Sequence, residues 1–356
     1  MRWHHAPVYA YVCRHPTHKT VADAHGSEQL HNKYLRCIER TQMIEINNLT
    51  KTFDDIRAVN DVTFEIPDGV MYGILGTNGA GKSTLLRMMA GIIEPDAGEI
   101  RIDGILCYDN PVCKERFFYL SDTPYYFPNA SMEVMTAFYQ RQYQGMDLEN
   151  VSGMAELLDL DMKRPIRTFS KGMKRQAFLI MALCANTRYL LCDEVFDGLD
   201  PVVTEVMKNL LRQEMKERKL TVVVVSHKLQ DLEDICHHIG ILHKGGILKA
   251  GDMREQAKNI HKYQCVFQKD SWSEEKQKAY LEEYLDIVRF RKEGHFVTLI
   301  VRENLKKVSV TEHRDHIGQV VEKLYPVFCQ EVPMTLEEIF IAEMEESGYD
   351  IRKVLQ

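Results

Sequence analysis

One short stretch constrains this chain more than any other: GTNGAGKST, which fits the pattern G-x-x-x-x-G-K-[ST]. It lies between an apolar run, Met71 to Leu75, and a segment with helical spacing from Leu85 to Ala90. Glycines allow the amides of such a loop to face phosphate oxygens, and the amino end of the helix adds a favourable dipole. The pattern predicts a phosphate-binding loop made of Gly76, Thr77, Asn78, Gly79, Ala80, Gly81, Lys82, Ser83 and Thr84.

Two side chains of this loop carry specific chemistry. Lys82 is expected to bridge the β- and γ-phosphates of a nucleotide, and Ser83 to ligate magnesium. The alternative is a glycine-rich strand-to-helix turn that binds nothing, which the complete pattern in its required context disfavours. By itself, the loop indicates only a P-loop nucleoside triphosphatase, a class with very many activities.

Short apolar runs alternate with longer helical patterns from Met43 onward, which predicts an α/β fold with a parallel sheet covered by helices. Three runs are almost continuously apolar and are predicted to be buried strands: Met71–Leu75, Tyr189–Cys192 and Val222–Val225. Reactive side chains follow each of them. Because open parallel sheets bind ligands at the carboxyl ends of their strands, we expect the functional site there.

Composition limits the partners and the compartment. The chain has 356 residues, a formal charge of −7 and a pI near 6.1, so nucleic acid is not an expected partner. Nine scattered cysteines in a chain of this size fit free thiols in a reducing compartment. No window reaches the roughly 18 consecutive apolar residues of a membrane span, so we expect any membrane crossing to be made by other chains.

The start of the chain has neither helical nor alternating periodicity, and residues 1–42 are predicted to be a disordered extension. In an alternative hypothesis, Met43 is the biological start and the extension is not part of the functional protein. A zinc site made of Cys13, His15, His18 and His25 is disfavoured, because the paired spacing of zinc modules is absent.

The rest of the chain divides into two predicted domains. Residues 43–255 form the nucleotide-binding domain, in which a helical pattern over about 117–185 predicts an inserted helical lobe. Residues 256–356 combine alternating and helical segments, and they predict a small α+β accessory domain without a catalytic constellation. Thr335 and Glu338 fit a capping box for its final helix.

Further motifs accompany the phosphate loop. The apolar run from Tyr189 delivers two adjacent carboxylates, Asp193 and Glu194. FSKGMKRQ at residues 169–176 precedes it, and GLDP at 198–201 and Ser226-His227 follow it. In the order and spacing of these motifs, residues 43–251 resemble the ABC (ATP-binding cassette) ATPases. A P-loop kinase or GTPase has no counterpart for the signature, the GLDP loop or the histidine.

The resemblance implies a fold, a cofactor set and an assembly. The fold is a P-loop NTPase core of mostly parallel sheet flanked by helices, with an antiparallel β subdomain and the helical lobe. Two such domains are expected to pair head to tail around two ATP molecules with Mg²⁺. The pair is either a homodimer or includes a different nucleotide-binding subunit.

The resemblance also assigns roles to individual residues. Lys82, Glu194 and His227 are expected to be catalytic, with Glu194 polarising the attacking water and His227 contacting the γ-phosphate. Ser83 and Asp193 are expected to hold magnesium. The other implied nucleotide contacts are Phe53 on adenine, Ser170 and Gly172 on the partner's ATP, and Asp200 in the loop that links the two sites.

Three of these residues have plainer alternatives. Phe53 is an ordinary core residue in one alternative, and His227 is a loop histidine in another. Asp200 precedes Pro201, a pairing that equally suits the first turn of a helix capped by the aspartate.

Some positions depart from the family pattern. Asp122 stands where glutamine is usual, in a loop that senses the transmembrane partner; it is assigned to the nucleotide site, although its charge adds to that of the neighbouring acids. The signature reads Phe-Ser-Lys-Gly-Met, where Leu-Ser-Gly-Gly-Gln is commoner. That form, together with segment 336–340, resembles the branch that energises bacterial exporters of drugs and antimicrobial peptides. Aromatic residues crowd segment 117–127, where they fit either an interface with a membrane subunit or the core of the lobe.

The resemblance implies a function: ATP binding and hydrolysis that drive export through separate transmembrane permease subunits. The chain is then cytoplasmic, and peripheral on the inner face of the cell membrane through its partner. The alternative is a soluble, non-transport ABC ATPase with a regulatory role. The interval between Lys82 and Ser170 is too short for a coiled-coil arm, and the chain holds a single cassette, which disfavours the main soluble types.

Overall fold

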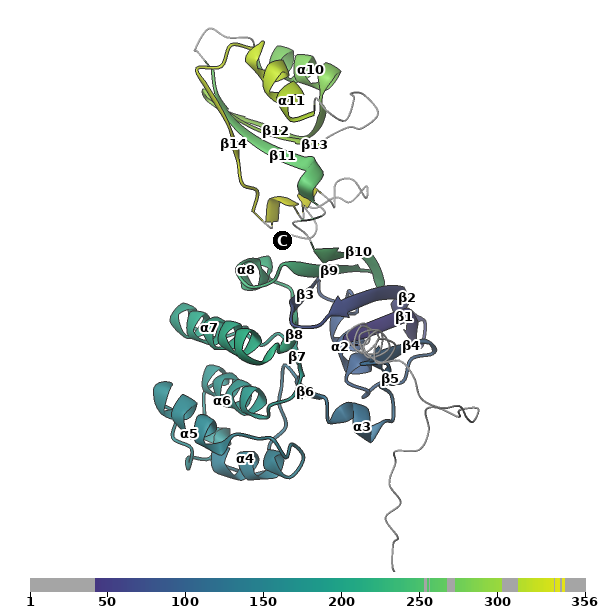
Figure 1. Cartoon of the computed structure of the whole chain (residues 1–356), viewed down its shortest axis with the longest axis vertical. Helices are drawn as coiled ribbons and strands as arrows, with labels where there is room; N and C mark the ends of the chain where they lie inside the picture. Colours follow the sequence, from purple (N-terminus) through teal and green to yellow (C-terminus); the bar gives the residue numbers. More distant parts are fainter. Residues whose placement is uncertain are drawn as a thin grey trace, which may run out of the picture. The chain divides into compact units, whose positions relative to one another are not determined.

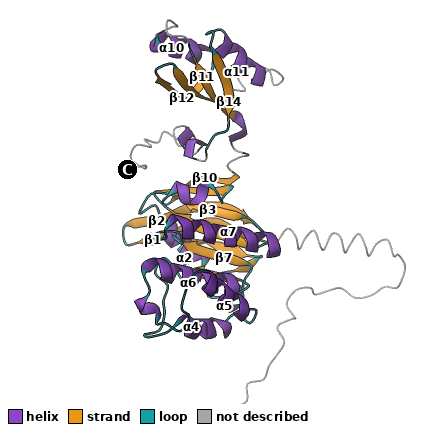
Figure 2. Ribbon diagram, turned by 90° about the vertical axis from the view of Figure 1, so that its left-hand side faces the viewer, coloured by secondary structure: helices purple, strands orange, loops and turns teal. Residues whose placement is uncertain are grey.

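The computed structural model describes residues 42–252, 255, 257–267, 273–302, 313–335, 337–339 and 341–342. Residues 1–41 of the predicted extension, including Cys13, His15, His18 and His25, lie outside the described residues, and so do Leu336 and Phe340 of the tail segment. The described part contains three β-sheets with the helices that cover them (Figures 1 and 2).

A six-stranded sheet forms the centre of the first domain, with strand order β10-β9-β3-β8-β7-β6 (Figure 1). Strands β9, β3, β8, β7 and β6 are parallel to their neighbours, and β10 pairs antiparallel with β9 at one edge. Every residue of β3, β7 and β8 is buried, which is why these three sequences are apolar throughout. The predicted buried parallel strands are therefore confirmed. The bounds are β3 Met71–Leu75, β6 Phe117–Leu120, β7 Tyr189–Asp193, β8 Thr221–Ser226, β9 His238–His243 and β10 Gly246–Asp252.

Alternate side chains of these strands enter two separate cores. Tyr72 and Val223 pack with helix α2 and a four-stranded antiparallel sheet of order β2-β1-β4-β5, whereas Met71 and Val222 pack with the helical lobe. The antiparallel subdomain implied by the family resemblance is thus present. Its elements are β1 Met43–Phe53, β2 Ile56–Pro67, β4 Ala97–Ile102 and β5 Ile105–Leu106, with α2 Lys82–Met89 and α3 Pro111–Lys114 between β3 and β6.

Helices α4 to α7 cover the other face of the parallel sheet, and Figure 2 shows α7 in front of that sheet. Helix α6 is buried on all sides from Arg175 to its end, which explains its apolar sequence.

No helix within the described ranges is both long and apolar enough to cross a membrane. The bounds are α4 Met132–Gln140, α5 Leu148–Leu157, a 3₁₀ turn Ile166–Thr168, α6 Lys171–Cys184, α7 Pro201–Arg218 and α8 Leu229–Glu233.

The start of the predicted helical lobe requires a correction. Residues Phe117–Leu120 form strand β6, which pairs in parallel with Tyr189–Cys192, and the first helix of the lobe begins only at Met132. The run Phe-Phe-Tyr-Leu is too short for periodicity to separate a buried strand from a helix.

The predicted accessory domain contains a four-stranded antiparallel sheet of order β12-β13-β11-β14, and its predicted α+β character is confirmed. Its elements follow one another as β-α-β-β-α-β, the split βαβ arrangement, with α10 and α11 on one face of the sheet (Figure 1). Tyr263, Leu299 and Val301 belong to its own hydrophobic core. The bounds are a 3₁₀ turn Ala257–Asn259, β11 Ile260–Val266, α10 Glu274–Tyr284, β12 Asp286–Glu293, β13 Phe296–Arg302, α11 His313–Glu322 and β14 Phe328–Val332.

The predicted capping box at the last helical segment is present. The Thr335 amide donates to Glu338 Oε2 at 3.0 Å, and the Glu338 amide donates to Thr335 Oγ1 at 3.2 Å. Lys262 Nζ on β11 contacts Glu338 Oε1 at 2.6 Å, so the cap also ties this segment to the sheet.

We predict that Thr335→Ala lowers the free energy of unfolding by about 1 kcal/mol, because the Glu338 amide loses its acceptor. Thr335→Ser keeps the hydroxyl and is expected to retain most of that stability. Chemical denaturation followed by circular dichroism measures both variants. Equal losses for alanine and serine would contradict a role for the hydroxyl as a cap.

Candidate active site

The reactive side chains lie at the carboxyl ends of neighbouring parallel strands, where the sequence placed them. The phosphate loop follows β3, Glu194 follows β7 and His227 follows β8, and these strands are adjacent in the order β3-β8-β7 (Figure 1). In the sheet register, Leu75 pairs with Ser226, and Asp193 pairs with Val225. The loops that follow the three strands therefore leave the sheet at one level.

Two close backbone approaches fix the shape of the phosphate loop. A Cβ atom on Gly76 would lie 2.3 Å from the Leu242 carbonyl oxygen, and one on Gly81 would lie 2.0 Å from the Ala58 carbonyl oxygen. Gly81 also has a φ of 100°, in the region that favours glycine. The loop is packed between β2 and β9, and only glycine fits at both positions.

Lys82 is buried beneath this loop. Its Nζ donates to the carbonyl oxygens of Gly76 at 2.8 Å and Thr77 at 3.0 Å. Burial lowers the pKa of Lys82, and the nearby carboxylates of Glu194 and Asp193 oppose that shift. The ammonium is thus held at the loop by carbonyl groups and by two acids, in a position suited to phosphate oxygens.

Ser83 and Asp193 form the candidate magnesium site. Ser83 Oγ donates to Asp193 Oδ1 at 3.1 Å, while Asp193 Oδ2 is buried and has no hydrogen-bond partner among the residues that the structure describes. Burial raises the pKa of Asp193, with further contributions from Asp122 and Glu194. An unsatisfied buried carboxylate oxygen beside a serine hydroxyl suits a hard cation that takes oxygen ligands, so these residues fit Mg²⁺.

Glu194 and His227 face one another. His227 Nδ1 lies 2.9 Å from Glu194 Oε1, and both side chains are partly exposed, at 33% and 26%. Glu194 has a φ of 48°, a left-handed conformation that costs a non-glycine residue of the order of 1–2 kcal/mol. Its amide donates to the Val225 carbonyl at 2.9 Å, which helps to hold that conformation against β8. The structure thus brings together two residues whose roles were predicted separately, and the contact between them was not itself predicted.

The sequence analysis did not single out Arg175 as a functional residue. Its side chain is buried, and one Nη donates to the Glu194 carbonyl oxygen, so it supports the strained turn that carries the carboxylate. Its position within the signature segment was the one hint in the sequence that Arg175 has a function. The contact with Glu194 could not be predicted, because nothing in the sequence spacing relates the two residues.

Ser170, Gly172 and Asp200 lie at helix amino ends. Ser170 Oγ accepts from the Met173 amide at 3.1 Å and caps α6, and a Cβ on Gly172 would lie 3.3 Å from the Gly198 carbonyl oxygen. Asp200 Oδ1 accepts from the amides of Val202 and Val203, each at 3.0 Å. The plainer alternative for Asp200, a helix cap before Pro201, is thus a role that it does fill.

Phe53 is not a core residue. It ends β1 with 44% of its surface exposed, and Lys51 Nζ lies 5.5 Å from the centre of its ring. Because the ring is exposed, it is accessible for the predicted contact with adenine.

Asp122 follows β6, the strand next to β7. Its Oδ1 accepts from Thr123 Oγ1 at 3.3 Å, and its charge contributes to the raised pKa of Asp193. Across the described ranges, however, His, Cys, Asp and Glu side chains nowhere gather in threes in a geometry that holds a metal ion. Asp122, Asp193 and Glu194 therefore do not form a cation cage by themselves.

Part of the aromatic segment 117–127 lies in the core, and part of it is exposed and available for an interface. Phe117 and Phe118 are buried, whereas Tyr125 is 71% exposed and Phe127 is 37% exposed. The strand part of the segment belongs to the core, and the loop after Asp122 presents aromatic surface.

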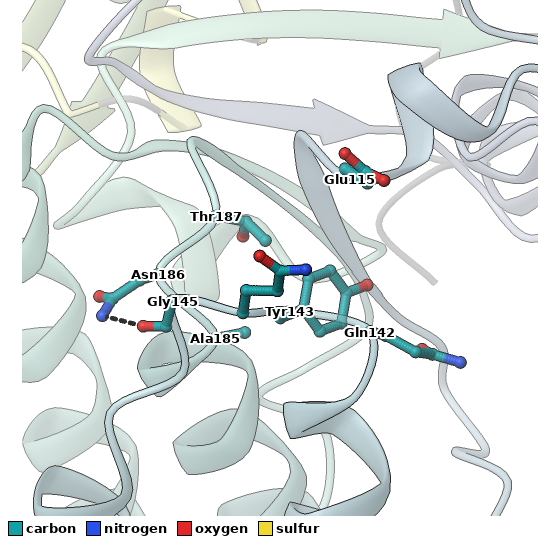
Figure 3. A pocket seen from close by; sticks show the side chains of 8 residues that line it. Glu115, Gln142, Tyr143, Gly145, Ala185, Asn186 and Thr187 are labelled. Atoms are coloured by element: carbon teal, nitrogen blue, oxygen red, sulfur yellow. Dashed lines mark hydrogen bonds between the residues drawn. The ribbon is translucent and has the colours of Figure 1, made fainter. Parts of the chain in front are cut away.

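A pocket of about 260 Å³ lies elsewhere on the domain (Figure 3). Asn186 Nδ2 donates to the Gly145 carbonyl at 2.7 Å across its wall, and Thr187 in its lining closely precedes β7. The pocket is therefore at the amino end of β7, away from Asp193, and takes no part in the site.

Comparison with known families and relatives agrees with this geometry. The family model described as ABC transporter matches residues 59–197. The ABC transporter ATP-binding protein YtrB of Bacillus subtilis is 28% identical over 301 residues, which is 85% of this chain and 98% of YtrB. The bacitracin transport ATP-binding protein BcrA of Bacillus licheniformis is 30% identical over 62% of this chain and 73% of its own length.

The methionine import ATP-binding protein MetN of Protochlamydia amoebophila is also 30% identical, over 61% of this chain and 68% of its own length. A solved structure of the ATP-binding subunit of an ABC transporter superposes with a TM-score of 0.55 at 25% identity, covering 60% of this chain and 93% of that one. The similarity therefore includes relatives named for import as well as for antibiotic transport.

We predict that Gly81→Ala destabilises the protein by about 3 kcal/mol, because the new Cβ meets the Ala58 carbonyl in a left-handed conformation. Gly79→Ala is the matched control: Gly79 has a φ of 78°, but a Cβ there would have no neighbouring atom within 4 Å, so only about 1 kcal/mol of backbone strain is expected. Denaturant unfolding of both variants measures the difference. Similar losses would show that the contact with Ala58 is unimportant.

Proposed function

Because this chain belongs to the ABC transporter family of ATP-binding subunits and is an ATPase of that family, we propose that it pairs around two ATP molecules and drives export through separate transmembrane subunits. The observation that carries the proposal is the contact between Glu194 and His227 beside the phosphate loop. A base, a residue that orients it and a phosphate cradle at one sheet edge are the parts that phosphoryl transfer to water requires.

The residues of this chain divide the work of hydrolysis. The loop amides and Lys82 bind the β- and γ-phosphates. Ser83 and Asp193 would hold Mg²⁺, whose positive charge would offset that of the phosphate oxygens. Glu194 accepts a hydrogen bond from the attacking water and polarises it, while His227 holds the Glu194 carboxylate and contacts the γ-phosphate. Phe53, exposed at the end of β1, stacks on adenine.

The proposed dimer places the amino end of α6 on the partner's nucleotide. Ser170 caps this helix, and its first-turn amides point outward from the amino end, where a helix favours phosphate. Gly172 lets the backbone approach the ligand, and Asp200 lies in the loop between the two sites. The second nucleotide-binding subunit is an identical chain or a related one.

Export is the direction we propose, on the Lys-Gly-Met signature and the similarity to BcrA, which is named for bacitracin transport. The exposed Tyr125 and Phe127 suit contact with a transmembrane subunit, which would hold the chain on the inner face of the membrane. Within this proposal, residues 43–255 are the engine and residues 256–356 an accessory domain for regulation or contact.

We predict that Glu194→Gln keeps ATP binding but slows hydrolysis by about 100-fold or more, because the amide does not polarise water as a carboxylate does. The slowed variant is expected to accumulate as an ATP-bound dimer, visible by solution mass measurement with and without Mg²⁺-ATP. Glu133→Gln, on the exposed face of α4, is the control and retains wild-type turnover. Turnover by Glu194→Gln at the wild-type rate would remove Glu194 from its role.

The transport part of the proposal has a separate test. Tagged chain purified from detergent-solubilised membranes of its own cell is expected to bring down a membrane-spanning subunit in a fixed ratio. Recovery only from the soluble fraction, without such a subunit, would contradict the proposal and favour a non-transport ABC ATPase.

A further inference from the structure

Asp197 is surrounded by three cations. Its Oδ2 lies 2.8 Å from Lys171 Nζ and 3.7 Å from an Nη of Arg175, and its Oδ1 lies 3.0 Å from Lys228 Nζ. The lysine hydrogen bonds hold the pKa of this carboxyl well below its usual range, and Asp197 in turn raises the pKa of Lys228.

The three cations come from separate segments of the site. Lys171 is the first residue of α6 and lies inside the signature, directly after Ser170. Lys228 directly follows His227, and Arg175 donates to the Glu194 carbonyl. Asp197 itself stands three residues after Glu194 in the turn that leads to the GLDP loop. A single carboxylate thus joins the segments that carry the base, its histidine and the signature.

Stability alone does not account for this cluster. Lys171 and Lys228 have 64% and 47% of their side chains exposed, and exposed ion pairs contribute little to folding because water and salt screen them. The cluster does hold separate segments together. It connects the segments that carry the strained Glu194 and His227 to a solvent-exposed lysine at the amino end of α6.

The position of Lys171 exposes this cluster to a second anion. Asp197 pairs with the ammonium of Lys171, while 64% of the lysine side chain, next to Ser170 in the chain, is exposed to solvent. A phosphate brought to the amino end of α6 competes with Asp197 for the same ammonium. Asp197 would then interact more with Lys228, which adjoins His227 in the chain, and with Arg175, which donates to the Glu194 carbonyl.

We propose that Asp197 is a positioning residue that couples the signature segment, through Lys171, to the chain's own hydrolytic pair, through Lys228 and Arg175. The proposal rests on the head-to-tail dimer proposed above, because the competing phosphate belongs to the ATP of the partner subunit. Arrival of that ATP is sensed at Lys171 and transmitted to Glu194 and His227 within one chain.

The test is the ATPase kinetics of Asp197→Asn, which removes the charge and keeps the size. We expect kcat to fall about 10-fold, the scale of a modest misplacement of catalytic groups, with KM for ATP changed by less than about 2-fold. We expect the wild type to be cooperative in ATP, because ATP at one site is sensed at the other, and Asp197→Asn to lower the Hill coefficient to about 1. Asp197→Glu, which restores the charge, should recover part of both losses.

A double-mutant cycle locates the effect in the Lys171–Asp197 pair. Lys171→Gln is expected to lower the Hill coefficient as Asp197→Asn does, and the double variant to be no worse than either single one, because both remove one interaction. The matched control is Glu99→Gln, which breaks the 2.7 Å pair between Glu99 and Arg101 on β4 and is expected to leave cooperativity unchanged.

The outcomes separate this inference from the proposed dimer. Wild-type kinetics and cooperativity in Asp197→Asn, while wild type dimerises with ATP, would overturn the coupling role and leave the dimer intact. A fall in kcat that accompanies a lower melting temperature, with the Hill coefficient unchanged, would reduce Asp197 to a structural residue and equally overturn it. If Glu194→Gln does not dimerise with ATP, the proposed function fails first, and the coupling has no second site to serve.

Discussion

The parallel pairing of β3, β8 and β7 is the constraint on which the site depends. Because Leu75 pairs with Ser226 and Asp193 with Val225, the loops that follow the three strands begin at the same level of the sheet. A shift of one residue in any of these strands would exchange the side chains that enter the two cores, so burial on both faces fixes the register. The apolar cores therefore also fix the level at which the segments carrying Glu194 and His227 leave the sheet.

Local patterns explain how much the sequence could predict. The phosphate loop, the three buried strands and the Thr335–Glu338 cap each depend on residues close together in the chain, and all are present in the structure. Strand β6 was wrongly placed in the helical lobe, because four apolar residues carry no periodicity and its identity comes from pairing with β7. Alternation likewise indicated strands after residue 256, but not β14 and not the strand order, which depends on contacts between segments far apart in sequence.

The contacts that the sequence did not reveal share one property. Lys171, Arg175 and Lys228 meet at Asp197 only because α6 and the loops after β7 and β8 converge in space. These residues lie inside or beside the motifs, but nothing in the sequence spacing pairs Lys171 of the signature with an acid three residues after Glu194. Asp200 shows the reverse case, in which a local cap and a proposed role between two sites use the same residue.

Charge at the sheet edge explains why nucleotide and cation are expected to bind together. Asp193 is buried, one of its oxygens has no hydrogen-bond partner in the described part of the chain, and Asp122 and Glu194 add to the cost of its charge. Lys82 offsets part of that charge, but its Nζ already donates to two loop carbonyls. A triphosphate would bring further negative charge to the same edge, so the phosphates are best accommodated when a divalent cation enters with them and takes the free Asp193 oxygen. The charge of Asp122 adds to this cost and would therefore make the site more dependent on that cation rather than less.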